Sequence, residues 1–170
     1  GVTLNGFTVG VYIAGCAASN ASSTTYYNYS NSGNITINGE IEDEAYIGGI
    51  AGKVTGVLNG CDNTGNVTVS AKTGNSPHIG GGAGYATGNI TSGSNSGTIS
   101  VSSTITTGTS YVGGYVGQCY GGTEFSEISN TGDVTFSGNS GNNTLAMGGV
   151  VGSVSIAGAF SNCSNIQIVE

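Results

Sequence analysis

The sequence contains very few charged residues. Asp, Glu, Lys and Arg make up 6% of its 170 residues, against about 25% in an ordinary soluble domain. Its cations are Lys53 and Lys72 alone, and the formal net charge is −7. Because no basic stripe is available to neutralise phosphate groups, the sequence argues against nucleic acid and anionic membrane surfaces as partners.

The sequence also lacks tryptophan and long apolar runs. No run approaches the roughly 20 apolar residues that a membrane span needs, so we expect no membrane insertion by this segment. A charged-then-apolar leader is also missing, which is typical of an intracellular protein or of a mature, excised piece of a secreted one. The abundance of Gly, Ser, Thr and Asn favours the second, and we expect an extracellular or bacterial cell-surface location.

Few residues are suited to catalysis or to metal binding. The four cysteines show no Cys-x-x-Cys spacing, and we expect free thiols that act as small buried hydrophobes. His78 is the only histidine and has no repeated acidic partner, so we interpret it as an aromatic residue at the coil edge. One acidic cluster, which matches no calcium-loop signature, comprises Glu40, Glu42, Asp43 and Glu44. We therefore expect no enzyme, no metal and no cofactor.

A short phrase recurs along the chain at nearly constant spacing. Its copies are separated by 32, 32 and 35 residues, and Asn165 lies a further 35 residues on. The copies are Asn31-Ser32-Gly33, Asn63-Thr64-Gly65, Asn95-Ser96-Gly97 and Asn130-Thr131-Gly132. Such a period is typical of repeat architectures, in which each unit buries its apolar face only by stacking on its neighbours. We expect one domain, 1–170, with repeats 1–30, 31–62, 63–94, 95–129 and 130–164 and a tail, 165–170.

Each repeat contains three apolar patterns that predict strands. The first is a β-branched alternation such as 35–37, the second is a glycine-paired run such as 46–52, and the third ends two positions before the next Asn, as at Cys61. These patterns predict an all-β fold. It would be a parallel β-helix, or β-solenoid, of about five coils with three short strands per coil, and right-handed as nearly all parallel crossovers are. In the first repeat Val11-Tyr12 stands where the glycine pair is expected.

The repeated asparagines predict a hydrogen-bonded ladder. In a stack of parallel coils they would lie above one another at the strand spacing, and their amides could donate to one another along the column. The predicted ladder consists of Asn31, Asn63, Asn95 and Asn130. The alternative is that Asn and Gly simply favour turns.

These patterns resemble the glycine-rich GLUG repeat. Its phrase is approximately aromatic-aliphatic-Gly-Gly-aliphatic-aliphatic-Gly, followed after a spacer by an Asn-Thr-Gly turn and a Val-x-Val strand. The nearest copy in this chain is 111–117 with 130–134. The resemblance implies a structural repeat of large bacterial surface and secreted proteins, including non-catalytic regions of immunoglobulin A peptidases and adhesins. It implies no catalytic residues.

Two surfaces are candidates for contact with a partner. One is an outward row of hydroxyls that could dock sugars, a partner's polar surface or ordered water, with simple solvation as the alternative. That row consists of Thr36, Thr68, Ser100 and Thr135. The other is an aromatic cluster, Tyr26 and Tyr27 with Tyr29 nearby, which suits stacking on a sugar or partner and equally suits packing over the first coil.

The sequence therefore predicts a non-enzymatic structural or adhesive module of a bacterial cell-surface or secreted protein. Its expected partners are a glycan or a host or bacterial surface protein, and end-to-end self-association through unpaired coil edges is a further expectation. Two other functions stay open. One is a carbohydrate-binding or polysaccharide-degrading β-helix protein, and the other is an ice-binding solenoid.

Overall fold

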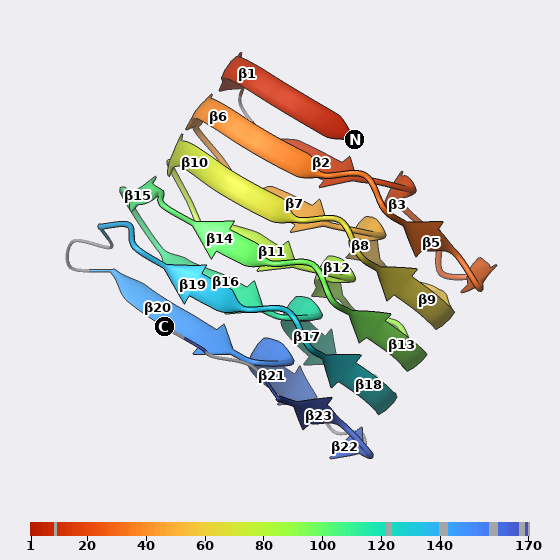
Figure 1. Cartoon of the computed structure of the whole chain (residues 1–170). Coiled ribbons are helices and arrows are strands. Elements are labelled where there is room, and N and C mark those ends of the chain that lie inside the picture. Colours follow the sequence, from red (N-terminus) through yellow and green to blue (C-terminus); the bar gives the residue numbers. More distant parts are fainter. Residues whose placement is uncertain (9, 122–123, 140–142, 157–159, 167–168, 170) are drawn as a thin grey trace.

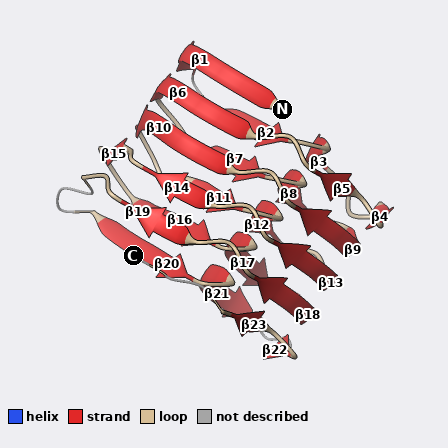
Figure 2. Ribbon diagram, viewed as in Figure 1, coloured by secondary structure: helices blue, strands red, loops and turns tan. Residues whose placement is uncertain are grey.

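The computed structural model describes residues 1–8, 10–121, 124–139, 143–156, 160–166 and 169. Within these ranges every regular element is a β-strand, and strands far apart in sequence lie side by side as successive layers of one stack (Figures 1 and 2). All strand pairs are parallel. The fold is thus a parallel β-solenoid of about five coils, as the repeat predicted.

Four parallel sheets, named A to D in chain order, form the walls of the coil. Sheet A contains β1 (Val2–Thr8), β6 (Ile35–Ile41), β10 (Val67–Thr73), β14 (Ile99–Val101), β15 (Thr104–Ile105) and β19 (Val134–Phe136). Sheet B contains β2 (Val11–Ala14), β7 (Ala45–Gly48), β11 (His78–Gly80), β16 (Thr109–Gly113) and β20 (Thr144–Gly148). Sheet C contains β3 (Ala17–Ser19), β8 (Ala51–Val54), β12 (Ala83–Ala86), β17 (Val116–Gly121) and β21 (Val151–Ile156). Sheet D contains β4 (Thr25–Tyr27), β5 (Ser30–Asn31), β9 (Val57–Asn63), β13 (Ile90–Asn95), β18 (Phe125–Asn130), β22 (Phe160–Ser161) and β23 (Ser164–Asn165).

The expected three strands per coil are wrong, because the glycine-paired run forms two strands. In the second coil β7 ends at Gly48 and β8 begins at Ala51, so the chain turns between sheets B and C. A Cβ at Gly48 would lie 2.0 Å from the carbonyl oxygen of Ala51, which leaves room for glycine only. The pair therefore marks a tight turn and not the middle of a strand.

The register of the first coil corrects a second expectation. Tyr12 pairs with Tyr46, and Ala14 pairs with Gly48. The glycine-pair position of this coil is therefore occupied by Ala14 and Gly15, and Val11-Tyr12 precedes it.

The interior of the coil is divided into two apolar clusters. One lies between sheets A and B and includes Ile35 and Ile47, and the other lies between sheets C and D and includes Val54 and Leu58. The turn between sheets B and C separates them, because its second glycine packs against the side chain of an asparagine at the end of sheet D. A Cβ at Gly49 would lie 2.4 Å from Asn63 Cγ. The coil is therefore pinched at this turn.

Sheets B and C also approach each other closely beyond the turn. A Cβ at Gly84 in sheet C would lie 2.6 Å from the backbone nitrogen of Ile47 in sheet B. Because side chains alternate along a strand, Tyr46 points away from the core that its neighbour Ile47 enters. The outward side chains of sheets B and C consequently meet outside the pinched turn.

The cysteines in the described structure are free, as expected from the sequence, but only two of them are fully buried. Cys61 and Cys119 lie in the cluster between sheets C and D, and burial raises the pKa of the Cys119 thiol to about 12. Cys163 is half-buried and Cys16 is exposed. The expectation of buried thiols is therefore correct for the middle coils and wrong for Cys16.

Candidate functional site: an aromatic groove between sheets B and C

The asparagine column forms a continuous ladder of amide hydrogen bonds. Each Nδ2 donates to the Oδ1 of the asparagine one coil on, at 2.8, 2.7, 2.8 and 2.8 Å along the series Asn31, Asn63, Asn95, Asn130 and Asn165. The same Nδ2 atoms also donate to a carbonyl oxygen two residues ahead, as Asn95 does to Gly97 at 2.7 Å. The ladder is a structural element, and its asparagine side chains face the inside of the B–C turn.

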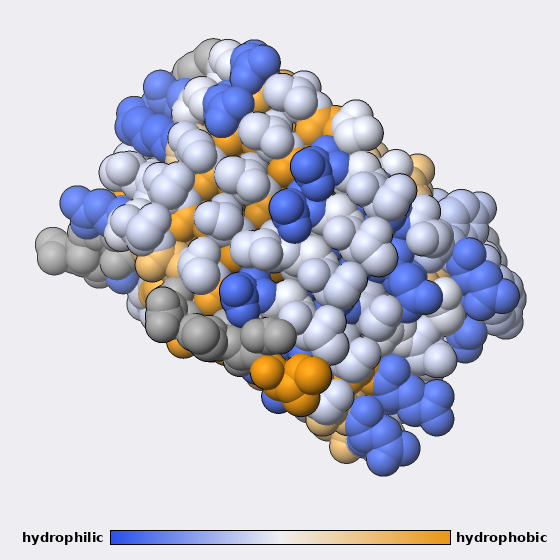
Figure 3. All heavy atoms as spheres, in the orientation of Figure 1, coloured by the Kyte–Doolittle hydropathy of each residue, from blue (hydrophilic) through white to orange (hydrophobic). Residues whose placement is uncertain are grey.

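The predicted hydroxyl row lies in register on sheet A. Thr68 pairs with Thr36 on one side and with Ser100 on the other, and Ser100 pairs with Thr135. All four side chains are half-buried, and the apolar residues that flank them are fully buried except Phe136, which is half-buried. Figure 3 shows this face, where residues of intermediate hydropathy cover most of the central area. The row is thus a flat, largely uncharged surface, and its role in contacts stays a prediction.

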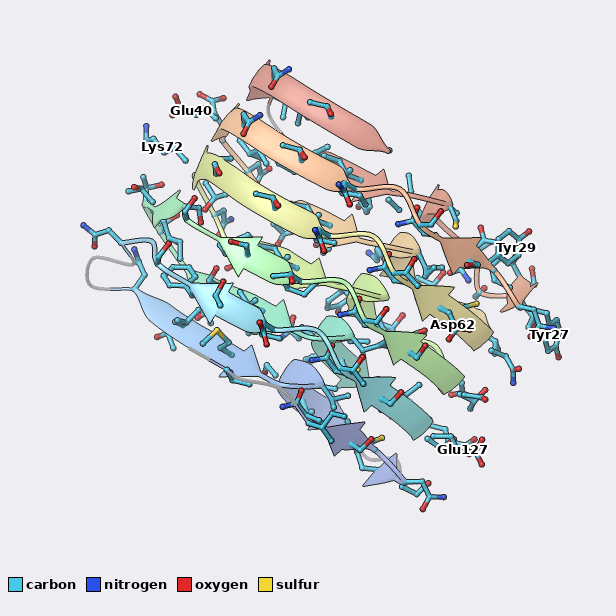
Figure 4. All side chains as sticks on the ribbon, in the orientation of Figure 1. Tyr27, Tyr29, Glu40, Asp62, Lys72 and Glu127 are labelled. Carbon is cyan, nitrogen blue, oxygen red and sulfur yellow. The ribbon has the colours of Figure 1, made fainter. Side chains whose placement is uncertain are left out.

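The predicted tyrosine cluster lies at the far edge of sheet D. Tyr26 and Tyr29 make an edge contact with ring centroids 5.1 Å apart, and Tyr26 packs against the core between sheets C and D. Tyr27 is 64% exposed and, like Tyr29, lies at the edge of the stack in Figure 4. Tyr26 thus packs over the first coil, as the alternative interpretation held, while Tyr27 and Tyr29 stay accessible.

The acidic cluster is dispersed by the fold. Glu40 forms an exposed ion pair with Lys72, with Oε1 and Nζ 2.5 Å apart (Figure 4), which contributes little to stability. Glu44 instead accepts a hydrogen bond from the hydroxyl of Tyr46. Among the described residues, no three His, Cys, Asp or Glu side chains are grouped as metal ligands would be.

A column of stacked aromatic rings runs along the outer face of sheet B. Tyr12, Tyr46, His78 and Tyr111 follow one another in successive coils. Their ring centroids are 4.9, 4.8 and 4.8 Å apart, and adjacent planes differ by 16°, 9° and 14°. Coil stacking alone brings the rings to this distance, because it equals the spacing of parallel strands.

A second column, on the outer face of sheet C, completes a groove with these rings. It consists of Lys53, Tyr85 and Gln118 in successive coils. The Tyr85 ring meets Tyr46 and His78 edge-on, at 5.6 and 5.2 Å between centroids. Lys53 Nζ lies 5.5 Å from the ring centroids of both Tyr46 and Tyr85, which is the geometry of a cation–π contact.

Between the two columns lies a surface pocket of about 230 Å³. We call it, with its walls, the aromatic groove. Its lining residues are Glu44, Tyr46, Ser76, His78, Tyr85, Tyr111, Gln118 and Tyr120. Every one of these side chains carries a polar atom, and none is aliphatic. The groove therefore combines aromatic surfaces with hydrogen-bonding groups and lacks the aliphatic side chains that fill the interior.

The groove is electrostatically unusual at His78. This side chain is 4% exposed, and its Nδ1 is buried with no hydrogen-bond partner among the described residues. Burial, and secondarily the nearby Lys53 ammonium, lowers the pKa of His78 to about 4. Burial and the Glu44 carboxylate raise the pKa of the Tyr46 hydroxyl. His78 and Tyr46 are therefore both neutral near pH 7, and the imidazole retains unused hydrogen-bonding capacity.

The sequence predicts only one wall of this groove, through His78 as an aromatic residue at the coil edge, at the repeat position that also holds Tyr46 and Tyr111. The other wall, with Tyr85 and Gln118, was missed. A signal was present, since Lys53, Tyr85 and Gln118 each follow the aromatic of their own repeat by seven residues. That spacing becomes informative only when the glycine-paired run is split into two strands, which brings the two positions onto opposite walls.

Comparison of the chain with protein-family models, with curated proteins and with solved structures finds no match in any of the three. The described part of the chain includes no helix with the length and hydropathy to cross a membrane.

Proposed function

We propose that this chain is a non-enzymatic structural and adhesive module of a bacterial cell-surface or secreted protein, built from GLUG-like repeats in a right-handed solenoid. The stacked coils would act as a stiff rod whose side faces make the contacts. Glycans and host or bacterial surface proteins are the partners we propose, and end-to-end self-association is a further part of the proposal.

The observation that carries this proposal is the hydroxyl row on sheet A. Four successive coils present Thr or Ser at the same outward position. The side chains beside the row are polar as well, and Asn38 Nδ2, for example, donates to Asn5 Oδ1 at 3.0 Å. A flat lattice of uncharged donors and acceptors suits a partner that is itself rich in hydroxyl or amide groups. The ladder inside the coil holds successive layers in a fixed register, which keeps the row straight.

A binding experiment with a matched pair of variants tests the proposal. The purified chain would be coupled to fluorescent beads and applied to cultured epithelial cells, to bacteria and to a glycan array. Thr68→Lys places a long charged side chain in the middle of the row, whereas Ser23→Lys adds the same charge at an exposed loop residue. We expect several-fold weaker adhesion from Thr68→Lys and no change from Ser23→Lys.

Other outcomes of the same experiment would contradict parts of the proposal. A folded chain that adheres to none of these surfaces would refute the adhesive role. Release of reducing ends from an applied polysaccharide would refute the non-enzymatic assignment. Thermal hysteresis that Thr68→Lys abolishes would assign the row to ice binding. Sedimentation across a concentration series tests self-association, which a strictly monomeric protein would refute.

A further inference from the structure

We infer that the aromatic groove is a second contact site, which binds an uncharged pyranose residue of a glycan. The groove is separate from the hydroxyl row, since its walls come from sheets B and C and the row lies on sheet A. The inference names a ligand class for the adhesive part of the proposed function and rests on that function only in this respect.

The concentration of aromatic side chains in one place is the first support. Five of the nine tyrosines of the chain belong to the groove or to its stacked column, together with the only histidine. They are Tyr12, Tyr46, Tyr85, Tyr111 and Tyr120. On a largely hydroxyl- and amide-rich outer surface, the groove offers an apolar ligand face several rings.

The ends of the two columns leave ring surface without an aromatic neighbour. His78 covers one face of Tyr111, but the residue that pairs with Tyr111 in the next coil is Ala146. In the same way Tyr85 is followed in its column by Gln118, which has no ring. Tyr120, on the margin of the pocket, is 53% exposed. The stack is therefore interrupted where the pocket opens, and a flat ligand can continue it.

The polar groups of the lining distinguish a sugar from a purely apolar ligand. A pyranose has an apolar C–H face and a rim of hydroxyls that both donate and accept hydrogen bonds. The groove offers the carboxylate of Glu44, the hydroxyl of Ser76 and the amide of Gln118 beside its rings. A pocket of about 230 Å³ is smaller than a site for a drug-sized molecule, which spans about 300–1,000 Å³, and it suits one sugar residue of a longer chain.

The charges around the groove favour a neutral ligand. Glu44 lines the pocket and opposes an anion, in a chain of formal net charge −7. The Lys53 ammonium already occupies the cation–π position over Tyr46 and Tyr85, and it opposes a second cation there. The burial that keeps His78 uncharged leaves its Nδ1 unpaired, and a ligand hydroxyl that reaches the ring edge could satisfy it after a small side-chain adjustment.

Titration of the intact chain with defined oligosaccharides tests this inference. The neutral probes are maltotriose, cellotriose and chitotriose, and the acidic probes are trigalacturonate and 3′-sialyllactose. Binding would be followed by calorimetry and by the NMR signals of the groove rings. We expect binding of at least one neutral probe and no binding of the acidic ones. Tyr111→Ala should weaken that binding about tenfold, whereas Tyr111→Phe, which keeps the ring, should change it by less than about threefold.

Two further variants keep the test decisive. Tyr27→Ala removes an exposed tyrosine outside the groove and should leave binding unchanged. Tyr120→Ala should weaken binding and, because its side chain is largely exposed, should fold even where Tyr111→Ala does not. Thr68→Lys should also leave binding unchanged, which separates failure of the groove from failure of the hydroxyl row. Failure of every neutral probe to bind, binding of a tyrosine- or proline-rich peptide instead, or equal losses in Tyr27→Ala and Tyr120→Ala would overturn the inference.

Discussion

The two sides of the turn between sheets B and C differ in how strictly they repeat. On the inner side the ladder carries asparagine in every coil. On the outer side the column that begins with Tyr12 continues with another tyrosine, a histidine, a third tyrosine and then Ala146. Both columns are produced by the same stacking. The repeat is therefore strict where a side chain bonds to its own equivalents and varies where the side chains only stack on one another.

Hydrogen-bond requirements explain the strictness of the inner column. Asn95 is fully buried and donates both to Gly97 O and to Asn130 Oδ1, while its own Oδ1 accepts from Asn63. Any other side chain at this position would leave buried polar groups above and below it without partners. The outer column imposes no such condition, because stacked rings need only a flat surface of similar size.

Removing one ladder residue should give the largest loss of stability. Asn95→Ala leaves Gly97 O and Asn130 Oδ1 each without one buried donor and opens a small cavity. We expect a loss of about 4 kcal/mol in the free energy of unfolding, measured by urea denaturation. Asn38→Ala, which removes an exposed amide hydrogen-bonded to Asn5 of the neighbouring coil, should cost less than about 0.5 kcal/mol. Equal losses from the two variants would show that a ladder hydrogen bond stabilises the fold no more than an exposed one.

The glycine that packs on the ladder should tolerate change almost as poorly. A Cβ at Gly81 would lie 2.3 Å from Asn95 Cγ and 2.4 Å from the carbonyl oxygen of Gly114. Since both neighbours are fixed by hydrogen bonds, Gly81→Ala should destabilise the fold by about 3 kcal/mol. At Gly10 the nearest atom to a new Cβ is 3.5 Å away, so Gly10→Ala is the matched control and should be nearly neutral. Similar thermal unfolding midpoints for the two variants would contradict this account of the turn.

The sequence was sufficient to predict what repeats with a fixed period. The spacing of Asn31, Asn63 and Asn95 predicted coils in register, and the alternation around Thr36 and Thr68 predicted an outward hydroxyl row. These features depend only on residues that occupy equivalent positions. The number of strands per coil was mispredicted, because an apolar run with two glycines has the composition of a strand whether or not it turns.

Features that depend on contacts between different positions of the repeat were not predictable. Tyr115 is fully buried and its hydroxyl donates to Cys61 O at 2.7 Å, two coils away in sequence. It occupies space that Gly82 and Gly93 leave empty, since a Cβ at either glycine would overlap the tyrosine side chain. The backbone of sheet D has another such feature. One residue per coil has positive φ there, including Ser92 at 55° and Glu127 at 56°, which no composition rule would select. The groove likewise required the distance between two walls.

His78 tests this difference between the columns most sensitively, because its burial shifts a pKa that lies between pH 4 and pH 7. Tyr46 and Tyr111 stack on it, Tyr85 meets it edge-on, and the charged groups near it are Lys53 and, on the pocket margin, Glu44. Its pKa falls from 6.5 to about 4 on folding, so the unfolded chain binds the extra proton between these values. Stability due to neutral His78 is therefore complete above pH 6.5 and is lost as the pH falls towards 4, by up to about 3 kcal/mol.

His78→Tyr, which installs the residue of the neighbouring coils, should remove this part of the pH dependence while other groups keep theirs. Unfolding free energies measured for both proteins from pH 8 to pH 4 should diverge as the pH falls. Parallel curves would mean that the outer column accommodates a protonated imidazole without loss of stability. The column would then accept charged as well as neutral rings.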